Sequence, residues 1–154
     1  MSKSFPLQPL IKLAQHQNDS ATRKLGQLNM QQQNAQQKLE TLQQYRRDYQ
    51  SRLQEAARNG MNPAELRNFQ EFINKIDEAI MQQTRVVEQS KASTQTGRNE
   101  FDSAQRKLKS FDTLRQRHVK TQKQVAEKSE QKMLDEHTGR IAARKMLKTN
   151  DPNT

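Results

Sequence analysis

The sequence contains no cysteine, and glycine and proline are scarce, with four of each in 154 residues. Without cysteine, neither a disulfide framework nor a thiolate metal site can form, and nothing requires an oxidising compartment. The first residues lack the continuous apolar stretch of a signal peptide, and no run approaches the roughly 18 apolar residues of a membrane span. We therefore expect a cytoplasmic protein.

Apolar residues are also few, at 31% of the chain, whereas 29% of the residues are charged and the mean hydropathy is −1.21. A typical globular chain is roughly 45–50% apolar. Such a composition leaves two options: disorder, or long helices that bury a narrow stripe. Gln, Lys, Arg, Glu, Leu and Ala dominate, and they lose little side-chain freedom in a helix. The composition therefore favours long helices.

A heptad seam runs through the first third of the chain in alternating steps of four and three. Its members are Leu7, Ile11, Ala14, Asn18, Ala21, Leu25, Leu28, Gln32, Ala35, Leu39, Leu42, Arg46, Tyr49, Leu53 and Ala56. Twelve of these fifteen are apolar, where composition alone would give about five. Such sustained periodicity is typical of a coiled coil. The polar members Asn18, Gln32 and Arg46 share one heptad position, and polar seam residues can fix register.

The seam ends at a turn signal, residues 58–65. Gly60 suits the left-handed residue just past a helix end, Asn62 an N-cap and Pro63 the first helical position, and Glu65 completes a capping box with Asn62. The sequence therefore predicts a long helix over 1–58, a turn over 59–63, a second and longer helix over 64–148 and a disordered tail over 149–154. We expect an all-α fold, an antiparallel coiled-coil hairpin with an overhanging second helix.

A turn this short joins antiparallel neighbours, so residue i should lie opposite about residue 122 − i. The second helix carries the matching seam: Leu66, Phe69, Ile73, Ile76, Ile80, Gln83, Val87, Ser90, Thr94, Gly97, Phe101, Ala104, Leu108 and Phe111. Small residues face large ones in this register, as interdigitating knobs require. The layers Gln32/Ser90, Leu28/Thr94 and Leu25/Gly97 are weakly apolar, so we expect the hairpin to be loosest there.

Nothing in the sequence indicates catalysis or a cofactor site. The three histidines have no neighbour at metal-binding spacing, and neither a glycine-rich phosphate loop nor a nucleophile elbow is found. We interpret His16, His118 and His137 as solvated helix residues, and we expect a non-enzymatic protein that binds no small-molecule substrate.

Two regions are candidate interaction surfaces. Near the turn, the pairing brings Tyr45 and Tyr49 close to Phe72, Ile76 and Ala79, which either thickens the hairpin end or forms a partly exposed apolar patch for a partner. At the other extreme, about forty C-terminal residues have no intrachain partner. Their amphipathic stretch, residues 131–144, is either a solvated helix or tail, or a helix that a partner completes.

Four blocks of sequence resemble the flagellar FliJ family over nearly the whole chain. They are an opening PLxxLIKLA pattern, the pair of tyrosines in Tyr45–Tyr49, the block FQEFINKIDEAI at 69–80 and the block AEKSEQKMLDEHTGRIAAR at 126–144. The FxxFIxxI and QKxxDExxxRxxxR patterns within the last two are the most specific. The Gln-rich first helix, for example Gln31–Gln33, departs from the family.

The resemblance implies a component of the bacterial flagellar type III export apparatus. FliJ-like proteins act as a stalk in the pore of the hexameric export ATPase, FliI, contact the export-gate protein FlhA and help recycle flagellar substrate chaperones. By this resemblance the protein would associate peripherally with the inner membrane at the flagellar base and be needed for motility.

Site residues follow from the resemblance only by position. Those that would contact the export gate are Lys38, Leu42, Tyr45, Tyr49, Phe72, Ile76, Ala79 and Gln83. Those that would contact the ATPase ring are Leu7, Ile11, Leu134, Arg140, Ile141 and Arg144.

Three other functions are compatible with the composition. The chain could be the equivalent stalk of a virulence type III secretion system. Its net charge of +10 would suit a nucleic-acid-binding coiled coil, although cations alternate with acids and no aromatic-basic recognition block is present. A homodimerising cytoskeletal coiled coil is disfavoured by the turn signal. We expect no nucleic-acid partner.

Overall fold

The computed structural model describes residues 5–149 and contains two helices. Helix α1 spans Gln8–Arg58, 51 residues, and helix α2 spans Pro63–Thr149, 87 residues. No strand occurs within residues 5–149. The predicted all-α hairpin with a longer second helix is confirmed. Thr149 still belongs to α2, and the rest of the tail predicted for 149–154 lies outside the described residues.

Helix α1 begins at Gln8 and not at residue 1, because residues 5–7 form a turn. The backbone N–H of Gln8 donates to the carbonyl oxygen of Phe5 at 3.1 Å, and that of Ile11 donates to Leu7 at 3.0 Å. Pro9 then lies in the first turn of the helix, where a missing backbone N–H costs no hydrogen bond.

The turn between the helices has the predicted chemistry at Gly60, Asn62 and Pro63. Gly60 has a φ of +87°, a left-handed conformation that glycine adopts without steric cost. The backbone N–H of Glu65 donates to Oδ1 of Asn62 at 2.9 Å, so Asn62 caps α2. Pro63 is the first residue of α2. The chain therefore reverses direction between Arg58 and Pro63.

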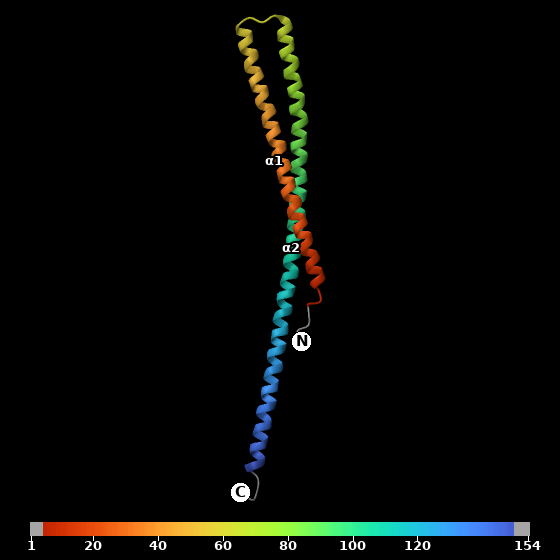
Figure 1. The fold of residues 1–154 in the computed structure, drawn as a ribbon, viewed down its shortest axis with the longest axis vertical. Coiled ribbons are helices and arrows are strands. Elements are labelled where there is room, and N and C mark those ends of the chain that lie inside the picture. The colour runs from red at the N-terminus through yellow and green to blue at the C-terminus, as the bar shows by residue number, and fades with distance from the viewer. Residues whose placement is uncertain (1–4, 150–154) are drawn as a thin grey trace. The chain divides into compact units, whose positions relative to one another are not determined.

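Two compact units share the helices. The larger unit is residues 14–106, and the described part of the smaller unit is residues 5–13 with residues 107–149. Figure 1 shows the two helical segments of the larger unit lying side by side and antiparallel on either side of the turn.

In the larger unit the register follows the prediction. Thr94 Oγ1 donates to the carbonyl oxygen of Leu28 at 3.3 Å, and Lys24 Nζ lies 3.1 Å from Glu100 Oε2. The residue numbers of these pairs add up to 122 and 124. Every member of the first seam is buried or half-buried, as is every member of the second except Leu66. The heptad pattern therefore identified the face that packs.

At the centre of this unit the Leu28/Thr94 and Leu25/Gly97 layers are packed closely, so the expectation that the hairpin is loosest there is wrong for these two layers. In the third layer Gln32 is half-buried and lines a surface hollow of about 440 Å³. Thr94 and Gly97 are buried. A Cβ atom added to Gly97 would lie 2.5 Å from Cδ1 of Leu28. Nearby, Gln83 Nε2 donates to the carbonyl oxygen of Ala35 at 2.9 Å. Small side chains let the two backbones approach, and the polar ones reach the facing backbone, so few apolar atoms are needed for close contact.

In the smaller unit, Phe5 packs against His118 with ring centroids 5.1 Å apart. His118 is half-buried, and its Nε2 atom is buried without a hydrogen-bond partner. The interpretation of His118 as a solvated residue is therefore wrong, because Phe5 packs over it. His16 and His137 are exposed, as expected. From residue 123 to 149 every side chain of α2 is exposed.

Candidate interaction surfaces

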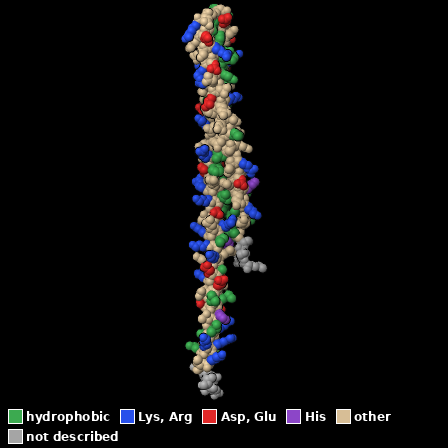
Figure 2. All heavy atoms as spheres, turned by 60° about the vertical axis from the view of Figure 1, so that its left-hand side comes forward, with side chains coloured by type: hydrophobic (Ala, Val, Ile, Leu, Met, Phe, Trp, Pro, Cys, Tyr) green, Lys and Arg blue, Asp and Glu red, His purple; other side chains and the backbone are tan. Residues whose placement is uncertain are grey.

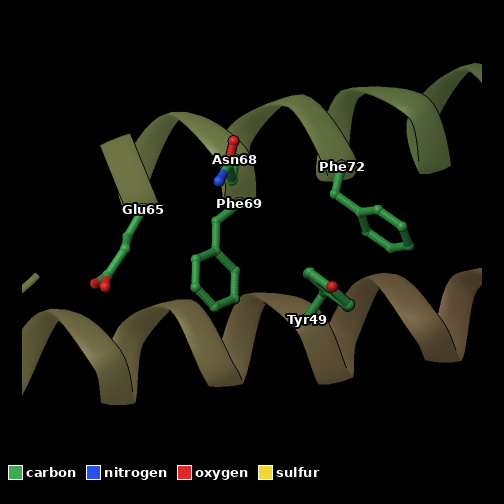
Figure 3. A pocket seen from close by; sticks show the side chains of 5 residues that line it. All are labelled: Tyr49, Glu65, Asn68, Phe69 and Phe72. Carbon is green, nitrogen blue, oxygen red and sulfur yellow. The ribbon is translucent and has the colours of Figure 1, made fainter. Parts of the chain in front are cut away.

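Three aromatic side chains meet between the helices near the turn. The ring of Tyr49 on α1 stacks on that of Phe72 on α2, with centroids 4.2 Å apart and planes at 24°. Phe69 tilts against the other side of Tyr49 at 5.6 Å. Figure 3 shows Phe69 and Phe72 extending from α2 toward Tyr49. Aromatic pairs in such offset arrangements contribute about 0.5–1.5 kcal/mol beyond the area they bury.

This cluster leaves a hollow on the surface. Tyr49, Phe69 and Phe72 line a groove of about 310 Å³ together with Glu65 and Asn68. Phe72 remains 44% exposed, and Leu66, six residues earlier, is 39% exposed although it is a seam residue. The turn end therefore has more apolar surface than the two helices can cover, which is typical of a contact site.

The eight residues predicted to contact the gate differ in accessibility. Tyr45 is 57% exposed and Phe72 44%, and Lys38 is also exposed. The other five, half-buried or buried, are Leu42, Tyr49, Ala79, Ile76 and Gln83. Among these, Ile76 is 7% exposed, and Gln83 is 8% exposed and hydrogen-bonded to the backbone of α1. A partner can reach the first three directly, whereas Ile76 and Gln83 support the surface from beneath.

Arg46, the charged seam residue, lies beside this cluster and faces α2. Its Nε donates to Oδ1 of Asp77 at 2.5 Å, its Nη2 lies 3.4 Å from Oδ2, and its Nη1 donates to Gln50. The hydrogen bond and the charge of Asp77 raise the pKa of the Arg46 guanidinium above its ordinary value. The seam thus accommodates a permanent cation by pairing it across the helices.

Sequence reasoning assigned Phe69 to the seam and did not expect it in this cluster. It gave Glu65 only a capping role and did not name Asn68. The signal for Phe69 was present in the FxxF spacing, which places two large rings one turn apart on a helix. Glu65 and Asn68 carry no comparable signal, because polar residues on the first turns of a helix are ordinary.

The residues predicted to contact an ATPase ring divide in the same way. Leu134 is 60% exposed and Ile141 43%, and Arg140 and Arg144 are exposed as well. Leu7 is half-buried and Ile11 only 3% exposed, so Ile11 belongs to the packed interior. The exposed members lie within residues 123–149, where no side chain is covered.

Cationic and acidic side chains are mixed along the helices, but cations are in excess over residues 115–149. On the face shown in Figure 2, Lys and Arg side chains are distributed along both helices with Asp and Glu among them. Residues 115–149 carry ten Lys and Arg against four Asp and Glu. No helix within residues 5–149 combines the length and the apolar character needed to cross a membrane.

The chain is similar to known proteins of one family over nearly its whole length. The family model described as "Flagellar FliJ protein" matches residues 2–147. The flagellar FliJ protein of Salmonella typhi is 28% identical over 145 residues, which cover 94% of this chain and 99% of that protein. The flagellar FliJ protein of Escherichia coli K12 is 26% identical over the same shares of both chains. A solved structure of CT670 from Chlamydia trachomatis, described as a YscO homolog, is 14% identical with a TM-score of 0.48 and covers 97% of this chain and 100% of that one.

Proposed function

This chain belongs to the flagellar FliJ family, and we propose that it is a coiled-coil stalk that couples the flagellar export ATPase to the export gate. Members of this family are non-enzymatic components of the flagellar export apparatus. The observation that carries the proposal is the family match over residues 2–147, together with a helical hairpin that presents an apolar surface near its turn.

The gate contact in this proposal is the surface around Tyr45 and Phe72. Two exposed aromatic residues beside a groove are typical anchors of a protein interface, since aromatic side chains bury large areas with few rotatable bonds. Lys38 lies on the same helix as Tyr45 and is exposed. We assign FlhA as the partner here, which would hold the protein peripherally at the inner membrane.

The ATPase contact in this proposal is the exposed part of α2. Residues 123–149 are helical throughout and present Leu134 and Ile141 to solvent, although nothing within the described chain covers them. A lone helix without a packed face is marginally stable in water, so a partner that covers it would stabilise it. The excess of cations over residues 115–149 suits an acidic surface inside a FliI ring.

The first experiment is the ATPase rate and ring assembly of purified FliI from the same organism, with and without this protein. Stimulation with ring formation supports the stalk. Leu134→Glu combined with Ile141→Glu should reduce stimulation at least about tenfold, whereas Val119→Glu, equally exposed on the same helix, should not. Absence of any binding to FliI would contradict the ATPase contact and leave the gate contact to be tested alone.

The gate contact has its own test. Tyr45→Ala combined with Phe72→Ala should weaken binding to the FlhA cytoplasmic domain at least about tenfold and impair swimming. Met30→Ala removes a side chain that is 66% exposed elsewhere on α1 and should change neither. Unchanged binding by the double variant would show that the gate surface lies elsewhere.

Recycling of substrate chaperones, the third part of the proposal, is tested by co-purification of chaperones with the wild-type protein.

A further inference from the structure

The two edges of the helix pair in the larger unit differ in chemistry. In a heptad lettered a to g, the seam occupies a and d, and the flanking positions e and g form the two edges. Lys24 and Glu100 both occupy g positions and pair at 3.1 Å, so the g positions of α1 face those of α2. We call the surface between the g positions of 38–52 and those of 72–86 the g groove.

The edge formed by the e positions is polar on both helices. Over the same length it carries Gln36, Gln43 and Gln50 on α1, and Asp77, Thr84 and Lys91 on α2. Part of it is closed, because Asp77 is bonded to Arg46 and Arg46 to Gln50. This edge offers solvated side chains and no apolar surface.

The g groove has an apolar wall on α2. Three successive g positions hold Phe72, Ala79 and Val86, seven residues apart. Phe72 is 44% exposed and Val86 46%, and Ala79 is half-buried. The three span 14 residues, about 21 Å of helix. The hollow beside Tyr49 opens on this edge too, because its lining includes Glu65 and Phe72, both at g positions.

The opposite wall of the g groove, on α1, is cationic. Its g positions hold Lys38, Tyr45 and Arg52. The guanidinium of Arg52 lies 5.9 Å from the centre of the Tyr49 ring. The ion pairs within the described chain involve other side chains, so neither Lys38 nor Arg52 forms an ion pair with a carboxylate of residues 5–149. The ion pair of Lys24 with Glu100 closes this edge farther from the turn.

A surface of this kind fits one class of partner. Apolar residues at heptad spacing beside an existing seam are what a third helix packs against, and the cationic wall selects acidic residues on one side of that helix. We propose that the g groove binds an amphipathic helix of the gate-side partner, about 15 residues long, with an apolar stripe facing α2 and acidic residues facing α1. This inference rests on the gate contact proposed above, and it adds Val86 and Arg52 to that surface.

The apolar part is tested with two variants on α2. Val86→Glu places a charge in the g groove, whereas Met81→Glu changes an apolar side chain that is 56% exposed but lies off the groove, at a b position. Against the FlhA cytoplasmic domain, Val86→Glu should weaken binding at least about tenfold and Met81→Glu less than about twofold. Equal effects of the two variants would overturn the extension of the surface to Val86.

The charged part is tested by salt. Lys38→Gln combined with Arg52→Gln should weaken binding and flatten its dependence on salt concentration, because the lost contacts are electrostatic. Lys12→Gln combined with Lys109→Gln removes the same charge from the smaller unit and should leave the salt dependence unchanged. A salt dependence identical to the wild type in the groove variant would overturn the acidic character of the partner helix.

The helical part is tested on the partner. Hydrogen exchange of the partner should show one segment of about 15 residues that gains protection when the wild-type protein binds and loses it with Val86→Glu. Protection confined to a folded domain surface would overturn the third-helix model. If Tyr45→Ala with Phe72→Ala also binds normally, the gate contact itself fails; if that variant is defective and Val86→Glu is not, only the present inference fails.

Discussion

Residues 76–97 and 123–149 belong to the same helix, yet they have opposite environments. The first stretch buries Ile76, Gln83, Val87, Thr94 and Gly97 against α1, whereas the second has no buried or half-buried side chain. The share of apolar residues does not separate them, since it is about one third in both stretches. The difference lies in the partner: one stretch carries a seam that matches α1, and the other has apolar residues on several sides of the helix. Periodicity, more than hydrophobicity, thus decides which part of α2 packs within the chain.

The largest difference between the two stretches is expected when the same substitution is made in each. Val87 is 4% exposed and Val125 is 62% exposed. Val87→Asp places an unpaired charge in the packed layer and should lower the free energy of unfolding by about 3–5 kcal/mol. Val125→Asp should change it by less than about 0.5 kcal/mol. Urea unfolding followed by circular dichroism measures both, and similar losses would mean that residue 125 is packed in solution.

Amide hydrogen exchange sharpens the comparison without a mutation. Amides of residues 76–97 open only with the larger unit, whereas those of 123–149 depend on local helix propensity and on contacts such as Gln131 with Asp135. We expect exchange at least about a hundredfold slower in the first stretch. Equal protection in the isolated protein would show that residues 123–149 are covered by a second copy.

Two glycines provide a smaller contrast. Gly139 has open space around it, so Gly139→Ala should raise local helix stability by about 0.5–1 kcal/mol. At Gly97 the same gain is offset, because the added methyl group must displace the end of Leu28, at about 1–3 kcal/mol for overpacking. Gly97→Ala should therefore not stabilise the protein. Helicity at 222 nm measures the effect of Gly139→Ala, and the midpoint of urea unfolding measures that of Gly97→Ala. A clear stabilisation by Gly97→Ala would contradict the close packing at this position.

The smallest effect is expected at the buried glutamine. Gln83→Leu removes the bond to the carbonyl of Ala35, but that carbonyl lies within α1 and keeps its helical donor. No polar group is left unpaired, so the stability should change by less than about 1 kcal/mol in either direction. Thermal unfolding measures it, with Gln131→Leu as the exposed control. A loss above 2 kcal/mol would show that the bond itself holds the helices together.

The fold was predictable because each of its determinants is local in sequence. The heptad spacing identified the packed faces, and Gly60, Asn62 and Pro63 located the turn. The close packing of α1 against α2 around Thr94 and Gly97 was not predictable from hydrophobicity. It depends on the small size of these residues and on the hydrogen bond from Thr94 to the backbone of α1. The contact between Phe5 and His118 was not predicted for another reason. Phe5 precedes α1, so it does not belong to the heptad pattern.

The candidate surfaces were predictable in outline. Pairing placed Tyr49 beside Phe72, which the structure confirms. Pairing alone could not show that Ile76 and Gln83 face inward while Tyr45 faces out, since this depends on the rotation of each helix about its axis. The difference between the e and g edges likewise requires knowing which edges meet, and the ion pair of Lys24 with Glu100 supplies that information.

The turn has a consequence for how the hairpin forms. Tyr49 touches Phe69 across a short loop, whereas the residues joined by the Thr94 to Leu28 bond are 66 apart in sequence. If the contacts next to the turn form first, each further pair of seam residues closes only a short additional loop. The chain then does not lose the entropy of closing a long loop in a single step. We expect the hairpin to zip from the turn, with Asn62 in its nucleus and Thr94 forming its bond late. Stopped-flow refolding would then slow with Asn62→Ala, while Thr94→Val would mainly speed unfolding.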